Sequence, residues 1–516
     1  MKILNRIKVL VATAVVLSSC AKDYLDTAPT NATGPDVAFE NVENAKAAVN
    51  GLARLMKRQY LSSQGFNGEG TIKMYYGNYM GNHFTAGGMG SSSSLVMNMD
   101  FLANPTSTYT FYPWYYYYMI ITNANAIIAN IDNASGAQNQ KDFLKAQALT
   151  FRAYSYMMLA QIYGDRWADS NNGATKAVVL RVNEGIEDLP LSTLAETYDL
   201  IYEDLNTAIS LYNSSGLDRN ANNNYEVNLD VAYAIYARAA LNKEDYVNAE
   251  KYAKLARAKY PLMSVAEYKS GFSNPNKEWI WSVFDSSDET IYFYSYQAYI
   301  AYNSTASAVR TTPKCISKEL YDQIPATDIR KDLFLSPTAD PSLVFKPNTG
   351  EGGENELAYI RGLYPDIPSN AKAYAYMQFK IKANDMPGVG HTNNFRSSEL
   401  LLIEAEAKYK QNKPASEIQA LLNELTRDSG RDPGYNCTLT GQALFDEIKK
   451  YRAIELWGEG FDWFDLKRWG DPVKRKSFSS GGNFASTFAV TIQPNEKNKW
   501  RVVTPAKETD YNPLID

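Results

Sequence analysis

The chain has 516 residues, with 52 Lys and Arg against 57 Asp and Glu and a formal net charge of −5. This near-balance offers no basic surface for a polyanion, so we expect no nucleic-acid partner. With two His, three Cys and no HExxH or CxxC spacing, the sequence lacks the ligands of a transition-metal centre. We expect no such metal and no cofactor, while bound calcium stays open. Hydroxylated rings are in excess, 38 Tyr against 20 Phe and 8 Trp, and such rings suit half-wet surfaces.

The first twenty residues have the layout of a secretory signal. Cations precede an apolar run at 9–17, and Leu17-Ser18-Ser19-Cys20 closes the segment. The run has nine residues, whereas a helix that crosses a bilayer needs roughly 20. The ending looks like a bacterial lipoprotein signal, in which the cysteine receives a diacylglycerol. We predict a signal peptide over 1–19 and lipidation at Cys20; an ordinary signal peptide that contains a cysteine is the alternative.

The other two cysteines, Cys315 and Cys437, lie 122 positions apart. One disulfide between them is an open alternative, but the spacing favours two buried thiols. Residues 20–40 contain Pro, Gly and short polar side chains, and we expect them to form a tether between lipid and fold.

From residue 41 the pattern becomes helical. Apolar side chains recur at close to 3.6-residue spacing from Phe143 to Tyr163, and Thr193 with Glu196 forms a capping box before another amphipathic stretch. The Ala-rich stretch 229–241 and the one after it, which ends at Tyr260-Pro261, are typical of a tetratricopeptide-type hairpin. Helices resume at 398–411, 415–426 and 442–457. We therefore predict a mainly α fold of stacked tetratricopeptide-like helical hairpins, with long irregular loops and a few short strands.

Two long segments between the helical blocks are rich in aromatic residues. The first, 65–107, combines glycines with rings, and long loops of this kind are usually functional or disordered. The second, 277–307, begins with a strand-like run and continues with tyrosines that partly alternate, so an extended segment would present them on one face. The crowded rings at 114–118 lead into a helix and are interpreted as packing. The candidate ligand-binding residues are Tyr75, Tyr76, Asn78, Tyr79, His83 and Phe84 in the first segment, and Tyr292, Tyr294, Tyr296, Tyr299 and Tyr302 in the second.

Two charged motifs stand near the C-terminus. Residues 395–407 read FRSSELLLIEAEA, and residues 448–470 contain Arg452, Glu455 and Glu459 ahead of Asp465 and Arg468-Trp469-Gly470. With 146–165 and the helix at 198–209, they resemble the SusD/RagB family of Bacteroidetes outer-membrane lipoproteins over nearly the whole mature chain. Tyr451 and Asp462 depart from the family pattern, which usually has an acidic residue and an Arg there. Arg452, Glu455 and Glu459 share one helix face, which indicates a structural, hydrogen-bonded charge cluster.

The resemblance implies five parts: a signal peptide at 1–19, a tether at 20–40, an N-terminal helical region at 41–275, a loop-rich binding region at 276–396 and a C-terminal region at 397–516. It also implies an outward-facing, lipid-anchored protein of the cell outer membrane. Such a protein captures a nutrient for a partner TonB-dependent transporter of the SusC type. Family members bind glycans in most cases and peptides in some, and both ligands stay open here.

An enzyme is the least favoured alternative. Glycosidases use two positioned carboxylates, and Asp285, Asp288 and Glu289 lie near the tyrosine segment. Among 57 acidic residues such proximity arises by chance, and no nucleophile elbow or Walker loop accompanies it. We therefore expect a binding protein without catalytic residues.

Overall fold

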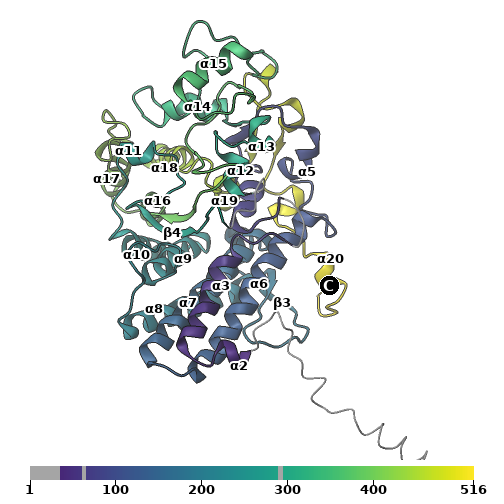
Figure 1. Cartoon of the computed structure of the whole chain (residues 1–516), viewed down its shortest axis with the longest axis vertical. Coiled ribbons are helices and arrows are strands. Elements are labelled where there is room, and N and C mark those ends of the chain that lie inside the picture. Colours follow the sequence, from purple (N-terminus) through teal and green to yellow (C-terminus); the bar gives the residue numbers. More distant parts are fainter. Residues whose placement is uncertain (1–34, 61–64, 289–294, 516) are drawn as a thin grey trace, which may run out of the picture.

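The helices of the N-terminal half pack side by side in chain order. In the computed structural model, which describes residues 35–60, 65–288 and 295–515, α6 packs on α7, α7 on α8, α8 on α9 and α9 on α10 (Figure 1). Each helix contacts the one before it, so the predicted mainly α scaffold of stacked hairpins is confirmed. The helices are α2 (Pro35–Ala38), α3 (Val42–Leu55), α6 (Thr108–Asn130), α7 (Gln138–Tyr163), α8 (Leu194–Ser215), α9 (Leu229–Asn242) and α10 (Tyr246–Arg257).

The stack continues into the C-terminal half. Helix α16 (Ser397–Lys410) packs on α10, and α17 (Ala415–Asn423) and α18 (Gly441–Glu455) pack on α16. The chain between α10 and α16 contains the loop-rich end of the molecule, which holds α14 (Lys318–Gln323) and α15 (Glu354–Leu363) (Figure 1). Strands β4 (Trp279–Val283) and β6 (Thr392–Arg396) pair antiparallel. They bring the two ends of this long segment together. The division into five parts stays a prediction.

The remaining elements are short. Strands form two-stranded antiparallel sheets, β1 with β5, β2 with β3 and β7 with β8. The elements are α4 (Gly68–Thr71), a π-helix (Ile72–Asn78), β1 (Phe84–Ala86), α5 (Ser94–Met97), β2 (Lys176–Val179), β3 (Leu191–Thr193), α11 (Val265–Tyr268), α12 (Tyr296–Ile300), α13 (Ser307–Arg310), β5 (Lys314–Ile316), α14 (Lys318–Gln323), α15 (Glu354–Leu363), a second π-helix (Glu424–Asp428), α19 (Asp462–Trp469), β7 (Val473–Lys474), β8 (Thr491–Ile492) and α20 (Ala506–Thr509).

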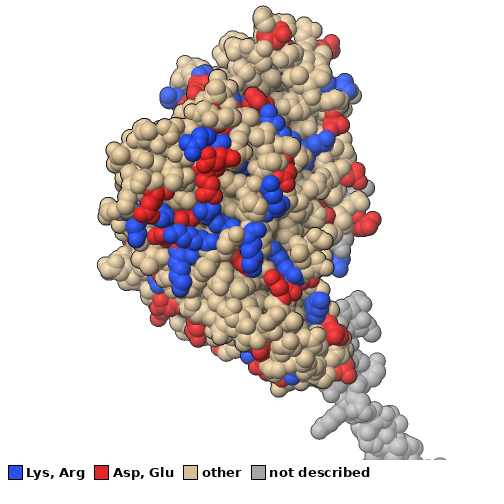
Figure 2. Space-filling view, turned by 90° about the vertical axis from the view of Figure 1, so that its left-hand side faces the viewer, with Lys and Arg blue, Asp and Glu red and all other residues tan. Residues whose placement is uncertain are grey.

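A band of mixed charge crosses the side of the molecule on which α10 and α17 lie (Figure 2). Ion pairs link α10 to α16 there: Arg257 contacts Glu404 at 3.0 Å, and Lys408 contacts Glu250 at 3.3 Å. Arg257 also reaches Glu424 at 2.7 Å, just beyond α17. Because cations and carboxylates alternate across three helices, this face holds the stack together and carries no large field of one sign.

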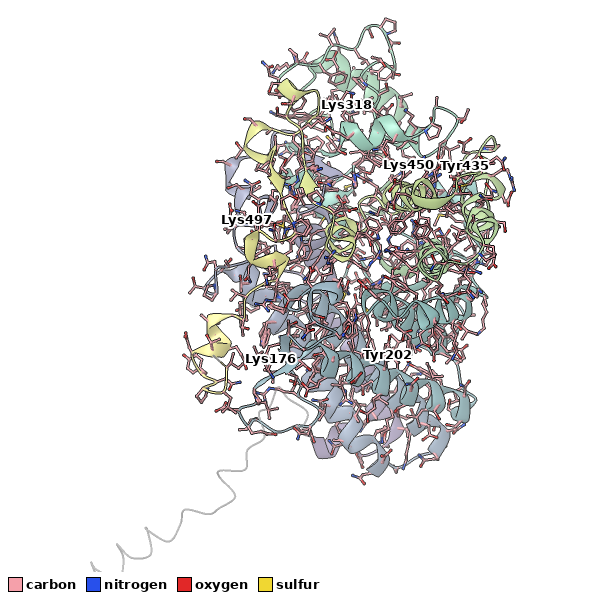
Figure 3. All side chains as sticks on the ribbon, turned by 180° about the vertical axis from the view of Figure 1, so that it is seen from behind. Lys176, Tyr202, Lys318, Tyr435, Lys450 and Lys497 are labelled. Carbon is pink, nitrogen blue, oxygen red and sulfur yellow. The ribbon has the colours of Figure 1, made fainter. Side chains whose placement is uncertain are left out.

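Small and flat side chains explain how closely α8, α9 and α10 approach. The alanines of α9 and α10 that face inward are fully buried, which lets the two backbones come together. Tyr202, Tyr236 and Tyr252, one from each helix, stack with ring centroids 4.5 Å and 3.9 Å apart; Tyr202 is labelled in Figure 3. The predicted capping box is also confirmed, because Thr193 and Glu196 each accept a hydrogen bond from the other's backbone N–H.

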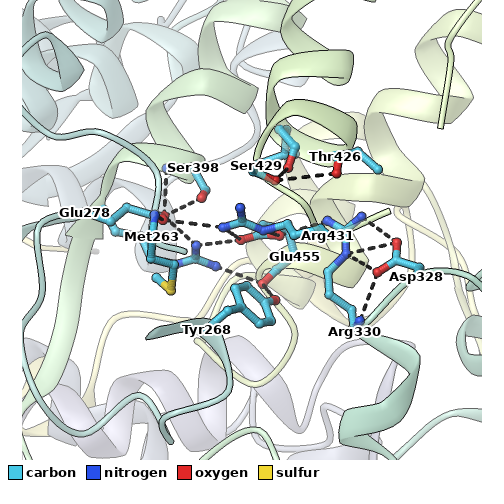
Figure 4. Close-up of polar contacts among 12 residues, drawn as sticks. Met263, Tyr268, Glu278, Asp328, Arg330, Ser398, Thr426, Ser429, Arg431 and Glu455 are labelled. Carbon is cyan, nitrogen blue, oxygen red and sulfur yellow. Dashed lines mark hydrogen bonds and ion pairs between the residues drawn. The ribbon is translucent and has the colours of Figure 1, made fainter. Parts of the chain in front are cut away.

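A buried ion cluster joins the two C-terminal motifs to Glu278, the residue before β4 (Figure 4). Arg396 donates to Glu278 and to Glu455 at 2.7 Å and to Glu459 at 2.8 Å. Arg330 donates to Glu455 at 2.9 Å. Burial alone would raise the pKa of Glu455, but the guanidinium groups of Arg431, Arg396 and Arg330 outweigh it and hold the pKa well below its usual range. The interpretation as a hydrogen-bonded structural cluster is confirmed for Glu455 and Glu459. The shared helix face is wrong, because Glu459 lies beyond the end of α18 and Arg452 pairs with Asp465 instead.

Both aromatic segments contain helix where irregular or extended chain was predicted. Residues 68–78 form α4 and a π-helix, and residues 296–300 form α12. The extended, alternating arrangement is therefore wrong for Tyr296 and Tyr299, which lie three apart on one helix. The physical reason is tertiary: the π-helix packs against α19, and Asn78 donates to Gly458 O at 2.9 Å and accepts from Gly460 N at 2.9 Å.

Gly77 provides a test of this packing. A Cβ atom there would lie 2.1 Å from Gly460 O, too close for any contact between non-bonded atoms. Gly77→Ala should lower the free energy of unfolding by about 1–3 kcal/mol, measured by urea denaturation. Gly51, inside α3, is the matched control because nothing lies within 4 Å of its added Cβ. Gly51→Ala should instead stabilise by up to about 1 kcal/mol. Equal effects of the two substitutions would contradict the packing described.

Two further expectations concern cysteines and membrane segments. Cys315 and Cys437 are buried free thiols, as favoured from the sequence. Within the three described ranges, no helix is long and apolar enough to span a bilayer. Cys20 and the signal peptide lie outside the described residues.

Candidate functional site

Rings from the two predicted segments meet at one half-buried surface. The Tyr75 hydroxyl donates to the Tyr299 hydroxyl at 3.3 Å, and the two rings are edge-to-face with centroids 6.1 Å apart. Phe66 and Tyr109 join them, with centroids 6.0 Å and 5.3 Å from Tyr75. All four side chains are partly exposed. We call Phe66, Tyr75, Tyr109 and Tyr299 the ring platform.

The platform is supported from below by a buried carboxylate. Glu69 accepts hydrogen bonds from the hydroxyls of Tyr116, Tyr117 and Tyr154 at 3.1, 3.0 and 2.9 Å, respectively. Burial raises the pKa of Glu69, although Lys73 and the tyrosine hydroxyls oppose the shift. These bonds tie α4 to α6 and α7, so the start of the first aromatic segment is fixed by the helical stack. They also show that the inward-facing tyrosines of α6 pack in the interior, as predicted.

A polar pocket lies next to the platform. Lys57 forms an ion pair with Asp285 at 3.2 Å, and its ammonium lies 5.5 Å from the ring centroid of Phe284, which is 38% exposed. His391 contacts the Phe284 ring edge-to-face, with centroids 5.1 Å apart. Burial raises the pKa of Asp285, while Lys57 lowers it. The pocket is lined by Met56, Lys57, Asn67, Gly70, Val283, Phe284, Asp285, Ser295, Tyr296, Gln297, Gly390 and Thr392.

Most of the predicted ligand-binding side chains lie inside the molecule. Six of them are buried, and each packs against a neighbouring element, as Phe84 does on Trp457 with centroids 5.2 Å apart. In this conformation a ligand reaches Tyr75, Tyr299 and His83 more readily than it reaches the buried six. Tyr292 and Tyr294 lie outside the described residues. The buried six are Tyr76, Asn78, Tyr79, Phe84, Tyr296 and Tyr302.

Phe66 and Tyr109 were missed in the sequence. Each stands next to a conformational signal, Phe66 directly after Gly65 and Tyr109 two residues after the helix cap Ser107. Phe66 stands at the start of the first segment and Tyr109 two residues beyond its end, and this placement is the signal that could have suggested them. Nothing in the periodicity of the segment distinguishes them from core rings.

His83 lies apart from the platform and pairs with the unusual Asp462. The imidazole Nδ1 is 2.8 Å from the Asp462 carboxylate, whose second oxygen accepts from the His83 backbone N–H at 2.6 Å. The aspartate that departs from the family pattern therefore links His83, the residue before β1, to the start of α19. Burial lowers the pKa of His83, but Asp462, with smaller contributions from Glu319 and Asp465, raises it more, so the pKa lies above its ordinary value.

This pair predicts a pH dependence of stability. A raised histidine pKa stabilises the fold fully below the unfolded pKa of about 6.5, and the contribution is lost as pH rises through the folded pKa. Unfolding free energies should therefore show that His83→Asn costs more at about pH 5.5 than at about pH 9, by about 1 kcal/mol or less for a partly exposed pair. His391 is the internal control, because burial and Lys57 lower its pKa. His391→Asn should show the opposite trend; the same trend in both variants would contradict the assignment.

Comparison with known proteins places this geometry in a family. Residues 233–514 match the model described as the SusD family, and residues 23–241 match the one described as starch-binding associating with outer membrane. No curated protein sequence matches the chain. Among solved structures, a SusD-like carbohydrate binding protein from Bacteroides vulgatus is 22% identical, with a TM-score of 0.73 over 92% of this chain and 98% of that one.

Two further structures share the fold. A SusD superfamily protein from Bacteroides thetaiotaomicron is 23% identical, with a TM-score of 0.73 over 92% of this chain and 99% of that one. Surface glycan-binding protein A from the same species, in complex with laminarihexaose, is 18% identical, with a TM-score of 0.66 over 91% of this chain and 97% of that one. The SusD family model matches more than half of the length of this chain, and the chain therefore belongs to the SusD family.

Proposed function

We propose that this protein is an outward-facing, lipid-anchored protein of the outer membrane that captures oligo- or polysaccharide for import through a partner TonB-dependent transporter of the SusC type. The observation that carries the proposal is the ring platform. Three of its four rings bear hydroxyls, and rings from three separate segments converge on one accessible surface.

The chemistry of the platform suits a sugar. The flat faces of aromatic rings stack on the apolar faces of pyranose rings, while hydroxyls of tyrosine satisfy sugar hydroxyls. The adjacent pocket adds the Lys57 ammonium and the Asp285 carboxylate, which can donate to and accept from sugar hydroxyls. A mostly apolar surface with a few placed polar groups is the usual composition of a small-ligand site.

Relatives support the ligand class. One family model that matches the chain is described as starch-binding, and one structure of the same fold was solved with laminarihexaose. Members of the SusD family are binding proteins and not catalysts, which agrees with a site whose Asp285 carboxylate is engaged by Lys57.

The membrane anchor is proposed to be lipid on Cys20. Cys20→Ala should abolish incorporation of radiolabelled palmitate and shift the protein from the outer-membrane fraction to the soluble fraction, because buried acyl chain supplies about 0.8 kcal/mol per CH₂. Cys315→Ala, which removes a buried thiol, is the matched control and should label normally. Equal palmitate labelling of the Cys20→Ala variant would place the lipid elsewhere.

The ligand class is tested by titration calorimetry. The soluble chain that starts after Cys20 should bind at least one member of an oligosaccharide panel that includes α- and β-linked glucans, and should bind none of a matched panel of peptides. Binding of peptides alone would replace the glycan with a peptide ligand. New reducing ends after incubation with the polysaccharides would show catalysis and overturn the binder assignment.

A further inference from the structure

The polar pocket beside the ring platform contains a pair of opposite charges. Its lining holds one cation, Lys57, and one carboxylate, Asp285, whose charged groups lie 3.2 Å apart. Both side chains are mostly buried, 15% and 12% exposed. The pocket has a volume of about 30 Å³ and is too small to enclose a sugar, so its charges act on a ligand that lies across its opening.

The Asp285 carboxylate is fixed by two backbone donors as well as by Lys57. The Ser286 N–H donates to one carboxylate oxygen at 3.0 Å, and the Gly390 N–H donates to the other at 3.4 Å. Burial is the main cause that raises the pKa of Asp285, whereas Lys57 and the two N–H groups lower it, because each of them favours the ionised form. The carboxylate therefore cannot turn away from Lys57 without losing these hydrogen bonds.

The Lys57 ammonium contacts the Phe284 ring as well as Asp285. Its Nζ lies 5.5 Å from the ring centroid, within the range of a cation–π contact. His391 contacts the same ring and is neutral at pH 7, since burial and then Lys57 lower its pKa. The side chains that line the pocket therefore carry no net charge.

This arrangement disfavours an acidic ligand. A sugar carboxylate or sulfate that approached Lys57 would also lie close to the Asp285 carboxylate, and like charges repel strongly where water is partly excluded. A sugar hydroxyl meets no such conflict, because it can accept from the ammonium and donate to the carboxylate. The pair is therefore complementary to uncharged sugars.

We propose that Asp285 is a specificity-determining residue, which restricts the ring platform to uncharged glycans and excludes those that carry carboxylate or sulfate groups. This inference rests on the proposed function, since it requires that a glycan covers the platform and reaches the pocket. Asp285 acts by compensating Lys57. Its removal leaves an uncompensated cation beside a stacking surface, which is complementary to an acidic sugar.

Titration calorimetry with pairs of oligosaccharides tests the proposal. Each pair consists of a neutral hexose oligosaccharide and the same compound with its primary hydroxyls oxidised to carboxylates, so that linkage and length are equal. The soluble wild-type chain should bind the neutral member at least about tenfold more tightly. In Asp285→Asn, the ratio of the two dissociation constants should shift toward the acidic member by about tenfold or more, and this gain should shrink as salt is raised.

Two further variants separate this effect from a change of net charge. Asp199→Asn is the matched control, because Asp199 lies 3.2 Å from Lys243, whose ammonium is 5.6 Å from the Trp167 ring, and this pair lies outside the pocket. It should keep the wild-type ratio. Lys57→Gln leaves the Asp285 carboxylate uncompensated and should shift the ratio further toward the neutral member.

The outcomes distinguish this proposal from the proposed function. If the wild-type chain binds the acidic member as tightly as the neutral one, glycan capture stands and the role of Asp285 is overturned. An unchanged ratio in Asp285→Asn, at the wild-type melting temperature, overturns that role as well. Binding of peptides with no binding of either member of any pair overturns both.

Discussion

Replacement of Arg396 by methionine is expected to lower the free energy of unfolding by about 3–5 kcal/mol, the usual cost of removing one partner from a buried ion pair. Arg396 is 1% exposed and donates to three carboxylates, those of Glu278, Glu455 and Glu459. Without its guanidinium, the three buried carboxylates lose the one cation that contacts all of them, and Arg330, Arg431 and Lys380 each compensate only one or two. Methionine preserves most of the volume, so the loss measures charge compensation and not a cavity.

Urea denaturation followed by circular dichroism measures this loss. Arg427→Met is the matched control, since Arg427 pairs with Asp428 at the surface and its side chain is 41% exposed. The control should unfold at the wild-type urea concentration. A loss below about 1 kcal/mol for Arg396→Met, within the range of surface pairs, would show that the cluster is dispensable for stability.

Removal of both rings at the centre of the platform is expected to weaken oligosaccharide binding by about 30-fold or more. Tyr75 and Tyr299 contact each other across the two segments, so truncation of both removes the flat surface that a sugar would cover. Aromatic anchors at binding sites contribute about 2 kcal/mol or more when truncated to alanine, which corresponds to this factor in Kd.

Calorimetric titration of Tyr75→Ala/Tyr299→Ala against the oligosaccharide that the wild-type protein binds best gives the affinity. Tyr511→Ala is the matched control, because Tyr511 is a single tyrosine 83% exposed on the C-terminal tail. Its affinity should equal that of the wild type. Unchanged binding by the double variant, with an unchanged melting temperature, would remove the platform from the ligand site.

The helical scaffold could be predicted because its signals are local. Thr193 and Glu196 cap a helix through groups three residues apart, and the alanines of α9 specify a close neighbour without reference to distant chain. The charge cluster was predictable in part for a related reason, since Arg452 and Glu455 lie on one helix, although Glu459 follows the end of that helix. Its partner Arg330 was not, because it comes from 125 positions away and carries no local pattern.

The site was harder to predict because burial of a tyrosine is decided by distant contacts. Tyr75 and Tyr76 are adjacent in sequence, yet Tyr75 is partly exposed while Tyr76 is fully buried and donates to the Tyr109 backbone carbonyl. The difference in exposure follows from the helical conformation of residues 68–78. That conformation depends on the contact of these residues with α19. A glycine-rich segment gives no local signal for such a helix, because glycine disfavours one.

The most direct test of the account is a crystal structure of the soluble chain with a bound oligosaccharide. We expect at least one sugar ring within about 4 Å of the rings of Tyr75 and Tyr299, with its polar edge toward the Lys57–Asp285 pocket. An oligosaccharide bound at another surface, with the four rings of the platform in solvent, would contradict the account.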